Sequence, residues 1–353
     1  MRCVEDFRMK LLLAGDIGGT STRLRLAPID NWRSHQWETT YPSQEFTDLA
    51  LIVQQFLAAA PIAGEVVSAC FAVAGPIEGR TASLTNLGWH LDIDQLISHL
   101  GIVNIKLIND FAAIGYGIEH LQPDEIHTLQ VGQPIDSAPR GLIGAGTGLG
   151  QGYLVPEAGT YQVLASEGGH SDFAARSEQE FRLVEYLMQR DGLDHVSCDR
   201  LISGTGIVNM YQFLLDQQQS GKELPGIAEA VNKWAITAAI DRPHLVDPAM
   251  LIAQAALAAT NQLATETMQL FLRAYGAETG NLALKFLPQG GLYIAGGIAA
   301  KNLNLMKNGT FMAAFLQKGR MQELLTKIPI RLILNTQVGL IGAAAQARGA
   351  VSH

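Results

Sequence analysis

The sequence LLLAGDIGGTSTRLRL, residues 11–26, decides the interpretation of the whole chain. An apolar run leads into an acid and two consecutive glycines, after which arginine and leucine alternate with a period of two residues. This order predicts two β-strands, residues 10–14 and 21–27, joined by a glycine turn. P-loops and Rossmann turns lead from a strand into a helix instead, so the turn resembles neither of these common nucleotide sites.

A glycine turn does not require an acid, so Asp16 needs its own explanation. Glycines let backbone N–H groups approach an anion closely, and Thr20 and Ser21 add hydroxyl donors. A carboxylate beside phosphates requires a cation between them. Asp16 is therefore a candidate for holding Mg²⁺ through water, because Mg²⁺ keeps much of its hydration shell. The alternative is an ordinary hairpin with Asp16 in an Asx-turn.

The composition describes a globular protein that binds small molecules. The chain has 353 residues, 48% of them hydrophobic and 16% charged, which predicts an α/β protein of two domains or one large domain. The net charge of −8 disfavours nucleic acid and anionic membranes as partners. Three cysteines without a CxxC pair predict free thiols in a reducing compartment. No signal peptide or membrane span is recognisable, so we expect a cytoplasmic protein.

Periodicity and turn residues predict an alternation of helices and strands. Asp92 is the expected N-cap of a short helix that ends at Gly101. Residues 121–139 are rich in loop signals. The other expected helices are residues 46–60, 176–190, 205–219, 248–275 and 338–349, and the other expected strands are residues 66–76, 104–110, 290–295 and 329–335.

A second glycine-rich turn, residues 144–150, repeats the strand, turn, strand theme. Gly146, Thr147 and Gly148 could form a second phosphate cradle, since glycine exposes the backbone and threonine adds a hydroxyl donor. A glycine-rich β-bulge or a tight junction between lobes is the alternative.

Asn109 and Asp110 end an apolar strand, at the position where open α/β sheets bind ligands. Asp110 is a candidate general base, and Asn109 could orient a substrate hydroxyl. The alternative is a helix N-cap for the helix that begins near Phe111.

Glu167 and His170 flank two glycines and could hydrogen-bond the hydroxyls of a sugar. A zinc site is the rival interpretation, but no cysteine lies close by in the sequence, and a plain surface loop is the third. Gly296 and Gly297 follow a buried strand and could let an adenine or ribose lie against the backbone.

The chain contains no Walker A sequence and no protein-kinase catalytic-loop motif. Its motifs together resemble those of the bacterial glucokinase family, a branch of the actin-like sugar kinases. The resemblance runs in order from about residue 10 to 348 and rests on GDIGGT (15–20), NDFAA (109–113), GTGLG (146–150), SEGGH (166–170) and AGGI (295–298).

The resemblance implies an α/β fold with two actin-like (ribonuclease H-like) lobes, a mixed central sheet in each and an intervening cleft. We expect residues 1–9 to be an N-terminal extension and residues 10–120 with 329–353 to form the small lobe. Residues 121–328 then form the large lobe.

The resemblance also implies an activity, which is phosphorylation of D-glucose at its 6-hydroxyl, the first step of glycolysis, by ATP with Mg²⁺ in a homodimer. Asp110 is in the position of the family's base. The implied sugar-binding residues are Asn109, Asp110, Glu167, His170 and Asp199. The implied nucleotide-binding residues are Gly15, Asp16, Ile17, Gly18, Gly19, Thr20, Gly146, Thr147, Gly148, Gly296 and Gly297.

One position departs from the family pattern. The family usually has a glutamate before its Arg-x-x-Ser-Gly segment, where this chain has Asp199, so sugar affinity or selectivity could differ. Three alternatives stay open: a non-catalytic sugar sensor, a kinase for another hexose, and a kinase or phosphatase that acts on acetate or polyphosphate.

Overall fold

The computed structural model describes residues 9–33, 37–84, 87–217, 225–237, 242 and 245–350. The chain forms two compact units, the first made of Met1–Gln122 with Gln337–His353 and the second of Pro123–Thr336. Residues 1–8 of the expected N-terminal extension lie outside the described part of the chain.

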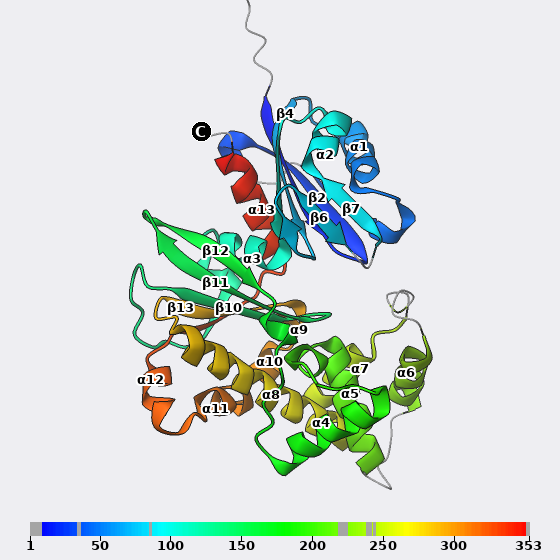
Figure 1. The fold of residues 1–353 in the computed structure, drawn as a ribbon, viewed down its shortest axis with the longest axis vertical. Coiled ribbons are helices and arrows are strands. Elements are labelled where there is room, and N and C mark those ends of the chain that lie inside the picture. The colour runs from blue at the N-terminus through cyan, green and yellow to red at the C-terminus, as the bar shows by residue number, and fades with distance from the viewer. Residues whose placement is uncertain are drawn as a thin grey trace, which may run out of the picture. The chain divides into compact units, whose positions relative to one another are not determined.

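A five-stranded mixed sheet forms the centre of the first unit (Figure 1). Its strand order is β3-β2-β1-β4-β8. The strands β1, β2 and β3 pair antiparallel, whereas β4 and β8 run parallel to β1. The bounds are β1 Lys10–Ile17, β2 Ser21–Pro28, β3 Trp37–Pro42, β4 Glu65–Val73 and β8 Asn104–Asn109. The hairpin expected around the first glycine turn is therefore confirmed.

Helices cover both faces of this sheet. Alternate residues of β1 point to opposite faces, so each face has its own apolar core. Leu11, Leu13 and Ile17 join a core with the helices α1 and α2, whereas Leu12 and Ala14 join a core with α13. Asp92 caps α2 and Gly101 ends it at a φ of 69°, as predicted. The bounds are α1 Leu49–Ala59, α2 Ile93–Leu100, α3 Asp110–Ile118 and α13 Val338–Gly349, and a small sheet adds β5 Ile77–Glu78, β6 Thr81–Leu84 and β7 Trp89–Asp92.

The helices α3 and α13 touch through their backbones. A Cβ on Gly342 would lie 1.8 Å from the carbonyl oxygen of Ala113, and a Cβ on Gly117 would lie 2.1 Å from that of Val338. Only glycine permits this approach without movement, so the C-terminal helix fixes the helix that begins at Asp110.

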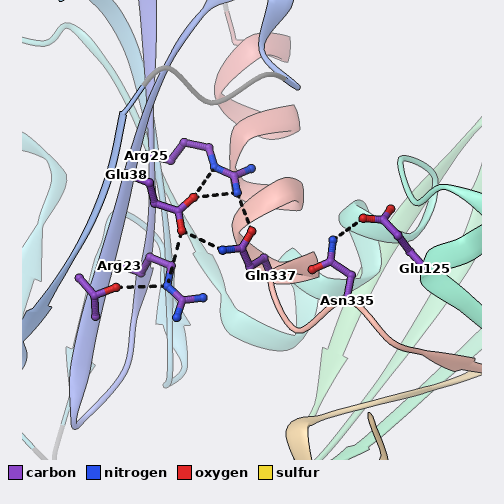
Figure 2. A network of polar contacts seen from close by, with 7 residues as sticks. Arg23, Arg25, Glu38, Glu125, Asn335 and Gln337 are labelled. Atoms are coloured by element: carbon purple, nitrogen blue, oxygen red, sulfur yellow. Dashed lines mark hydrogen bonds and ion pairs between the residues drawn. The ribbon is translucent and has the colours of Figure 1, made fainter. Parts of the chain in front are cut away.

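A partly buried ion pair anchors the start of α13 to the β2–β3 hairpin (Figure 2). Arg25 is 4% exposed and its Nη2 lies 2.9 Å from Glu38 Oε2. The Gln337 side chain closes the network, since its Nε2 donates to Glu38 and its Oε1 accepts from Arg25 Nη2 at 3.0 Å. These contacts tie the returning chain to the first unit.

The second unit repeats this plan around a six-stranded mixed sheet, with the order β12-β11-β10-β13-β14-β9. The first three strands again pair antiparallel, and β13 and β14 continue parallel to β10. A mixed sheet in each lobe is thus confirmed. The bounds are β9 Ile126–Gln130, β10 Arg140–Ala145, β11 Leu149–Glu157, β12 Thr160–Ser166, β13 Gly291–Ala295 and β14 Ile330–Ile333.

The helices of the second unit pack into one large apolar core with the central strands of this sheet. None of the described helices of the protein is long and apolar enough to cross a membrane. The bounds are α4 Glu178–Asp191, α5 Gly204–Gln217, α6 Pro225–Ile236, α7 Pro248–Leu257, α8 Gln262–Phe286, α9 Gly297–Lys301, α10 Leu303–Met306, α11 Thr310–Leu316 and α12 Gln322–Thr326.

Three expectations differ from the structure. The single helix expected over residues 248–275 is two helices, because Asn261 caps α8 by accepting from Ala264 N at 2.7 Å. The loop-rich segment contains the strand β9. The strand β14 pairs with β13 and β9, so the chain returns to the first unit at Gln337 instead of residue 329. In the second unit the end of β14 is held by Asn335, which donates to Glu125 (Figure 2).

Candidate active site

The first glycine turn is shorter than the motif that contains it. Gly15, Asp16 and Ile17 belong to β1, and Gly18 N donates to Ser21 O at 2.9 Å to close the turn. A Cβ on Gly15 would lie 2.6 Å from the Phe71 ring, so core packing alone requires this glycine. Ile17 is fully buried, side chain and backbone alike, and its carbonyl accepts from Ala74 N.

Ser43 braces the turn from outside the motif. Its hydroxyl donates to Gly18 O at 2.8 Å and lies 2.9 Å from the hydroxyl of Thr22, and its backbone N–H donates to Thr20 O at 3.0 Å. Ser43 is fully buried and follows Pro42. Nothing in the local sequence pattern predicted this contact, because it links segments more than 20 residues apart.

Asp16 lies mostly inside the protein, opposite Arg23 on the neighbouring strand. Burial raises the pKa of the Asp16 carboxyl, and the positive charge of Arg23 opposes part of that rise. Burying most of a carboxylate costs free energy unless an opposite charge compensates it. Asp16 is therefore suited to bind a cation.

Asn109 and Asp110 lie at the same end of this sheet. The register pairs Ile17 with Val73 and Val73 with Asn109, so one strand separates them from the first turn. Asn109 is the N-cap of α3, and its Oδ1 accepts from the N–H groups of Phe111 and Ala112. The capping alternative is therefore correct for Asn109, and Asp110 occupies the first helical position.

The Asn109 amide is also tied to the neighbouring strand, because its Nδ2 donates to Gly75 O at 3.2 Å. Asp110 Oδ1 accepts from Phe111 N at 2.9 Å. Its carboxylate lies at the positive end of the helix dipole, which favours a negative charge. The cap formed by Asn109 and the bond from Phe111 N to Asp110 Oδ1 thus fix the candidate base at the start of α3.

The second glycine turn lies between β10 and β11 of the second unit. Gly146 N donates to Gly148 O at 2.8 Å, and Gly204 N at the start of α5 donates to Gly146 O at 2.9 Å. Below the turn, Ala145 N donates to the hydroxyl of the fully buried Tyr275 at 3.2 Å. The Thr147 side chain is exposed at the tip.

The Ser166–His170 segment packs on the strand that leaves this turn. A Cβ on Gly169 would lie 1.9 Å from Leu149 O, and a Cβ on Gly168 would lie 2.3 Å from Gln151 Oε1. The two glycines therefore serve close packing. Glu167 and His170 project outward and are exposed, with His170 Nε2 3.7 Å from Glu167 Oε2.

Asp199 joins these two segments. It belongs to the 3₁₀ turn Cys198–Arg200, and its Oδ1 accepts from Leu149 N at 2.8 Å. A Cβ on Gly148 would lie 2.8 Å from the same oxygen. The residue next to it, Cys198, is buried, and burial together with the charge of Glu278 raises the pKa of its thiol to about 12.

Gly296 approaches the same strand end. Its φ is 87°, and a Cβ there would lie 2.3 Å from Ala145 O. Gly297 follows as the first residue of α9. The second unit thus brings Gly146–Gly148, Glu167, His170, Asp199 and Gly296–Gly297 together around β10 and β11. The first unit brings Gly15–Thr20, Asn109 and Asp110 to one end of its own sheet.

Comparison with known proteins identifies the family. The glucokinase family model matches residues 13–350. A glucokinase from Nostoc punctiforme is 54% identical over 340 residues, which cover 95% of this chain and 98% of that protein. The chain belongs to the glucokinase family. A glucokinase from a Synechocystis strain is 47% identical and covers 94% of this chain and 96% of its own length.

Solved structures of glucokinases agree with this assignment. A glucokinase from an Antarctic psychrotroph has a TM-score of 0.75 at 31% identity, and the match covers 96% of this chain and 99% of that one. A glucokinase from Balamuthia mandrillaris in complex with glucose has a TM-score of 0.79 at 22% identity, with 98% and 96% covered, and shows the shared fold. The actin-like sugar kinase fold expected from the motifs is confirmed.

Several residues that shape these segments were not predicted. Ser43, Tyr275 and Gln151 are buried polar residues that lie outside every motif of the family. Each supports a predicted segment through a contact that is distant in the sequence. Their burial is visible only in the tertiary structure, where a buried polar group must find a partner.

Proposed function

We propose that the chain transfers the γ-phosphoryl group of ATP to the 6-hydroxyl of D-glucose. Membership of the glucokinase family supports this, as does identity of up to 54% over 95% of the chain. The observation that carries it within the structure is the junction at Leu149, where Asp199, the Ser166–His170 segment and the second glycine turn meet. A sugar kinase requires sugar-binding and phosphate-binding groups in such proximity.

In this proposal Asp110 is the general base. Its carboxylate accepts the proton of the 6-hydroxyl as that oxygen attacks the γ-phosphorus, and the bond from phosphorus to the ADP oxygen breaks in line. Most of the catalysis is positioning and charge stabilisation, because the transition state for phosphoryl transfer is loose. The cap formed by Asn109 supports the base role, since it fixes the first turn of α3.

The sugar-holding side chains are assigned to Glu167, His170 and Asp199 of the second unit, with Asn109 of the first. Exposed carboxylate and imidazole groups at Glu167 and His170 can exchange their contact with each other for sugar hydroxyls. A site that hydrogen-bonds several hydroxyls discriminates against sugars that lack them, because its own polar groups are then left unpaired.

Phosphate binding is assigned to the two glycine turns, with Gly18, Gly19 and Thr20 in one and Gly146, Thr147 and Gly148 in the other. The partly exposed glycines of both turns support this, and so does the exposure of Thr147. Gly296 and Gly297 are assigned to the adenosine, next to the second turn.

Asp16 suits a Mg²⁺ ion shared with the nucleotide. The described residues contain no group of three acidic, histidine or cysteine side chains that could enclose a metal. Mg²⁺ in phosphate sites uses one or two carboxylates with phosphates and water, which the lone Asp16 can satisfy. When bound, the ion neutralises charge on the phosphates. The burial of Asp16 supports this role, because a carboxylate enclosed by protein is costly until a cation neutralises it.

We further propose that the enzyme acts as a cytoplasmic homodimer in the first step of glycolysis. The net charge of −8 and the family membership support this, and size-exclusion chromatography with light scattering tests the dimer.

A coupled assay tests the activity. Glucose, mannose, fructose and N-acetylglucosamine are offered as acceptors, with ATP or polyphosphate as the donor. We expect rapid turnover with glucose and ATP. Turnover only with another hexose would show that glucose is not the acceptor, and turnover only with polyphosphate would show that ATP is not the donor. Sugar binding without turnover would indicate a sugar sensor.

A further inference from the structure

The long helix α8 packs against β10, the strand that leads into the second glycine turn (Figure 1). Tyr275 and Glu278 are one helical turn apart and face the same strands. The Tyr275 hydroxyl accepts from the N–H of Ala145, the last residue of β10, and Glu278 accepts at 3.0 Å from Nε2 of Gln151, the third residue of β11. Tyr275 therefore supports the strand that enters the turn, whereas Glu278 supports a residue of the strand that leaves it.

Glu278 is a buried carboxylate in a fully satisfied polar cluster. It is 4% exposed, and its second oxygen accepts from Asn281 Nδ2 at 2.9 Å. Lys318 then donates to Asn281 Oδ1. Burying a carboxylate is expensive even with partners, and apolar residues in its place are often as stable. Stability alone therefore does not account for Glu278.

Glu278 determines how the Gln151 amide is oriented. A carboxylate only accepts hydrogen bonds, so the amide nitrogen of Gln151 must face it and the amide oxygen must face away. That oxygen lies against Gly168, where a Cβ would approach it to 2.3 Å. The orientation of one buried amide thus sets the surface on which the Ser166–His170 segment rests.

Glu278 also lies close to the residue before Asp199. Its charge contributes to the raised pKa of the Cys198 thiol, whose sulfur donates to Asp172 O at 3.7 Å. The carboxylate is therefore next to both chain segments that carry the proposed sugar-holding side chains.

We propose that Glu278 is a positioning residue for sugar binding, acting through Gln151 and Gly168 on the segment that bears Glu167 and His170. This inference rests on the proposed sugar kinase activity. It assigns sugar affinity to a buried carboxylate that touches neither substrate.

The test is steady-state kinetics of Glu278→Gln. The glutamine keeps the shape of Glu278 but offers one acceptor to the two amide donors of Gln151 and Asn281. Lys318 holds the Asn281 oxygen, so the Asn281 nitrogen keeps facing residue 278. Gln151 must therefore turn its oxygen toward the new amide nitrogen. We expect the KM for glucose to rise about tenfold or more while the KM for ATP stays within about twofold. Equal rises in both, or no rise in a folded variant, would overturn the inference.

Glu180→Gln is the matched control. Glu180 is 2% exposed, lies in the same unit and pairs with Arg176 through a contact of 2.7 Å. It has no contact with the Ser166–His170 segment among the contacts of the described residues. Its loss of charge should lower the melting temperature without moving the KM for glucose. A glucose effect equal to that of Glu278→Gln would contradict a specific role.

Two further variants keep the test decisive. Exchanging the partners, Gln151→Glu with Glu278→Gln, restores a carboxylate–amide pair and should recover at least about threefold of the lost glucose affinity. If Glu278→Gln does not fold, the apolar pair Gln151→Leu with Glu278→Leu decides, because replacing both partners can preserve stability. Unchanged glucose KM in that pair would overturn the inference. Absence of turnover in the unaltered chain would instead contradict the proposed activity.

Discussion

The carboxylate of Asp199 accepts a hydrogen bond from the backbone N–H of Leu149 at 2.8 Å. Asp199 is thus assigned to the proposed sugar site and also contacts the strand that leaves the turn proposed to bind phosphate. The aspartate side chain, shorter than the glutamate usual in the family, suits this contact. Its Oδ1 already lies 2.8 Å from the position that a Cβ on Gly148 would take. The aspartate at this position is therefore part of the turn's structure.

Asp199→Ala should impair both substrates. Removing the acceptor leaves the Leu149 N–H unpaired, which costs about 1–3 kcal/mol when the group is buried. We expect the KM for glucose to rise about tenfold or more and the KM for ATP to rise several-fold, in steady-state assays. Asp199→Asn keeps an acceptor and should spare the KM for ATP.

Asp172→Ala provides the control for this pair, because Asp172 is an exposed acid in the adjoining segment. Asp172→Ala should leave the KM for glucose and the KM for ATP unchanged. Identical, wild-type constants for Asp199→Ala and Asp199→Asn would contradict the role assigned to the Leu149 contact.

Gly342→Ala should destabilise the first unit. The new methyl group would lie 1.8 Å from Ala113 O, so α3 and α13 must separate. Overpacking of this kind costs about 1–3 kcal/mol or more in the free energy of unfolding. Denaturant titration measures this loss. Gly349→Ala in the same helix, where a Cβ meets nothing within 4 Å, should change stability by less than about 0.5 kcal/mol. Equal stability of the two variants would contradict the close packing.

Asp16 should destabilise the free protein at neutral pH. Its pKa is raised by burial in the folded state, so the folded state binds this proton more tightly than the unfolded state. Stability from this group is therefore lost as the pH rises from the unfolded pKa, near 3.8, through the raised folded value. Asp16→Asn removes the penalty. Its melting temperature should exceed that of the unaltered chain at pH 7.5, and the gain should shrink towards pH 4.

Asp94→Asn is the control, because the Asp94 pKa is shifted in the opposite direction. The hydrogen bond and the charge of Arg80 lower the pKa of the Asp94 carboxyl. It should give no gain at pH 7.5. Magnesium ATP should stabilise the unaltered chain more than Asp16→Asn. An Asp16→Asn protein that melts at or below the temperature of the unaltered chain at pH 7.5 would refute this account of Asp16.

Local signals in the sequence predicted the elements well where the signal and the structure are both local. The helix between Asp92 and Gly101 is an example, since an N-cap acceptor and a left-handed glycine act within one turn of the helix. The two hairpins around the glycine turns were predictable because a period of two residues encodes a strand directly.

Long-range pairing was less predictable. The strand Ile126–Gln130 is short and polar, and it exists because it pairs with β14 at the edge of the sheet. The predicted return to the small lobe at residue 329 was too early for the same reason. The strand β14 pairs with β13 and β9, and this long-range pairing leaves no signal in the local sequence. Glu278 was overlooked because a charged residue within a helix is ordinarily exposed, and only the tertiary structure supplies Gln151 and Asn281.

The most direct test of the central claim is the rate at which Asp110→Asn forms glucose 6-phosphate from glucose and ATP, measured with glucose 6-phosphate dehydrogenase. Asn109 caps α3 in this variant as before, so the fold and the KM for glucose should be nearly unchanged. Loss of the general base should lower kcat by about 10²–10⁴-fold. Asp92→Asn, at another helix start, should retain its kcat. Formation of glucose 6-phosphate by Asp110→Asn at close to the unaltered rate, or its absence with the unaltered chain, would contradict the account.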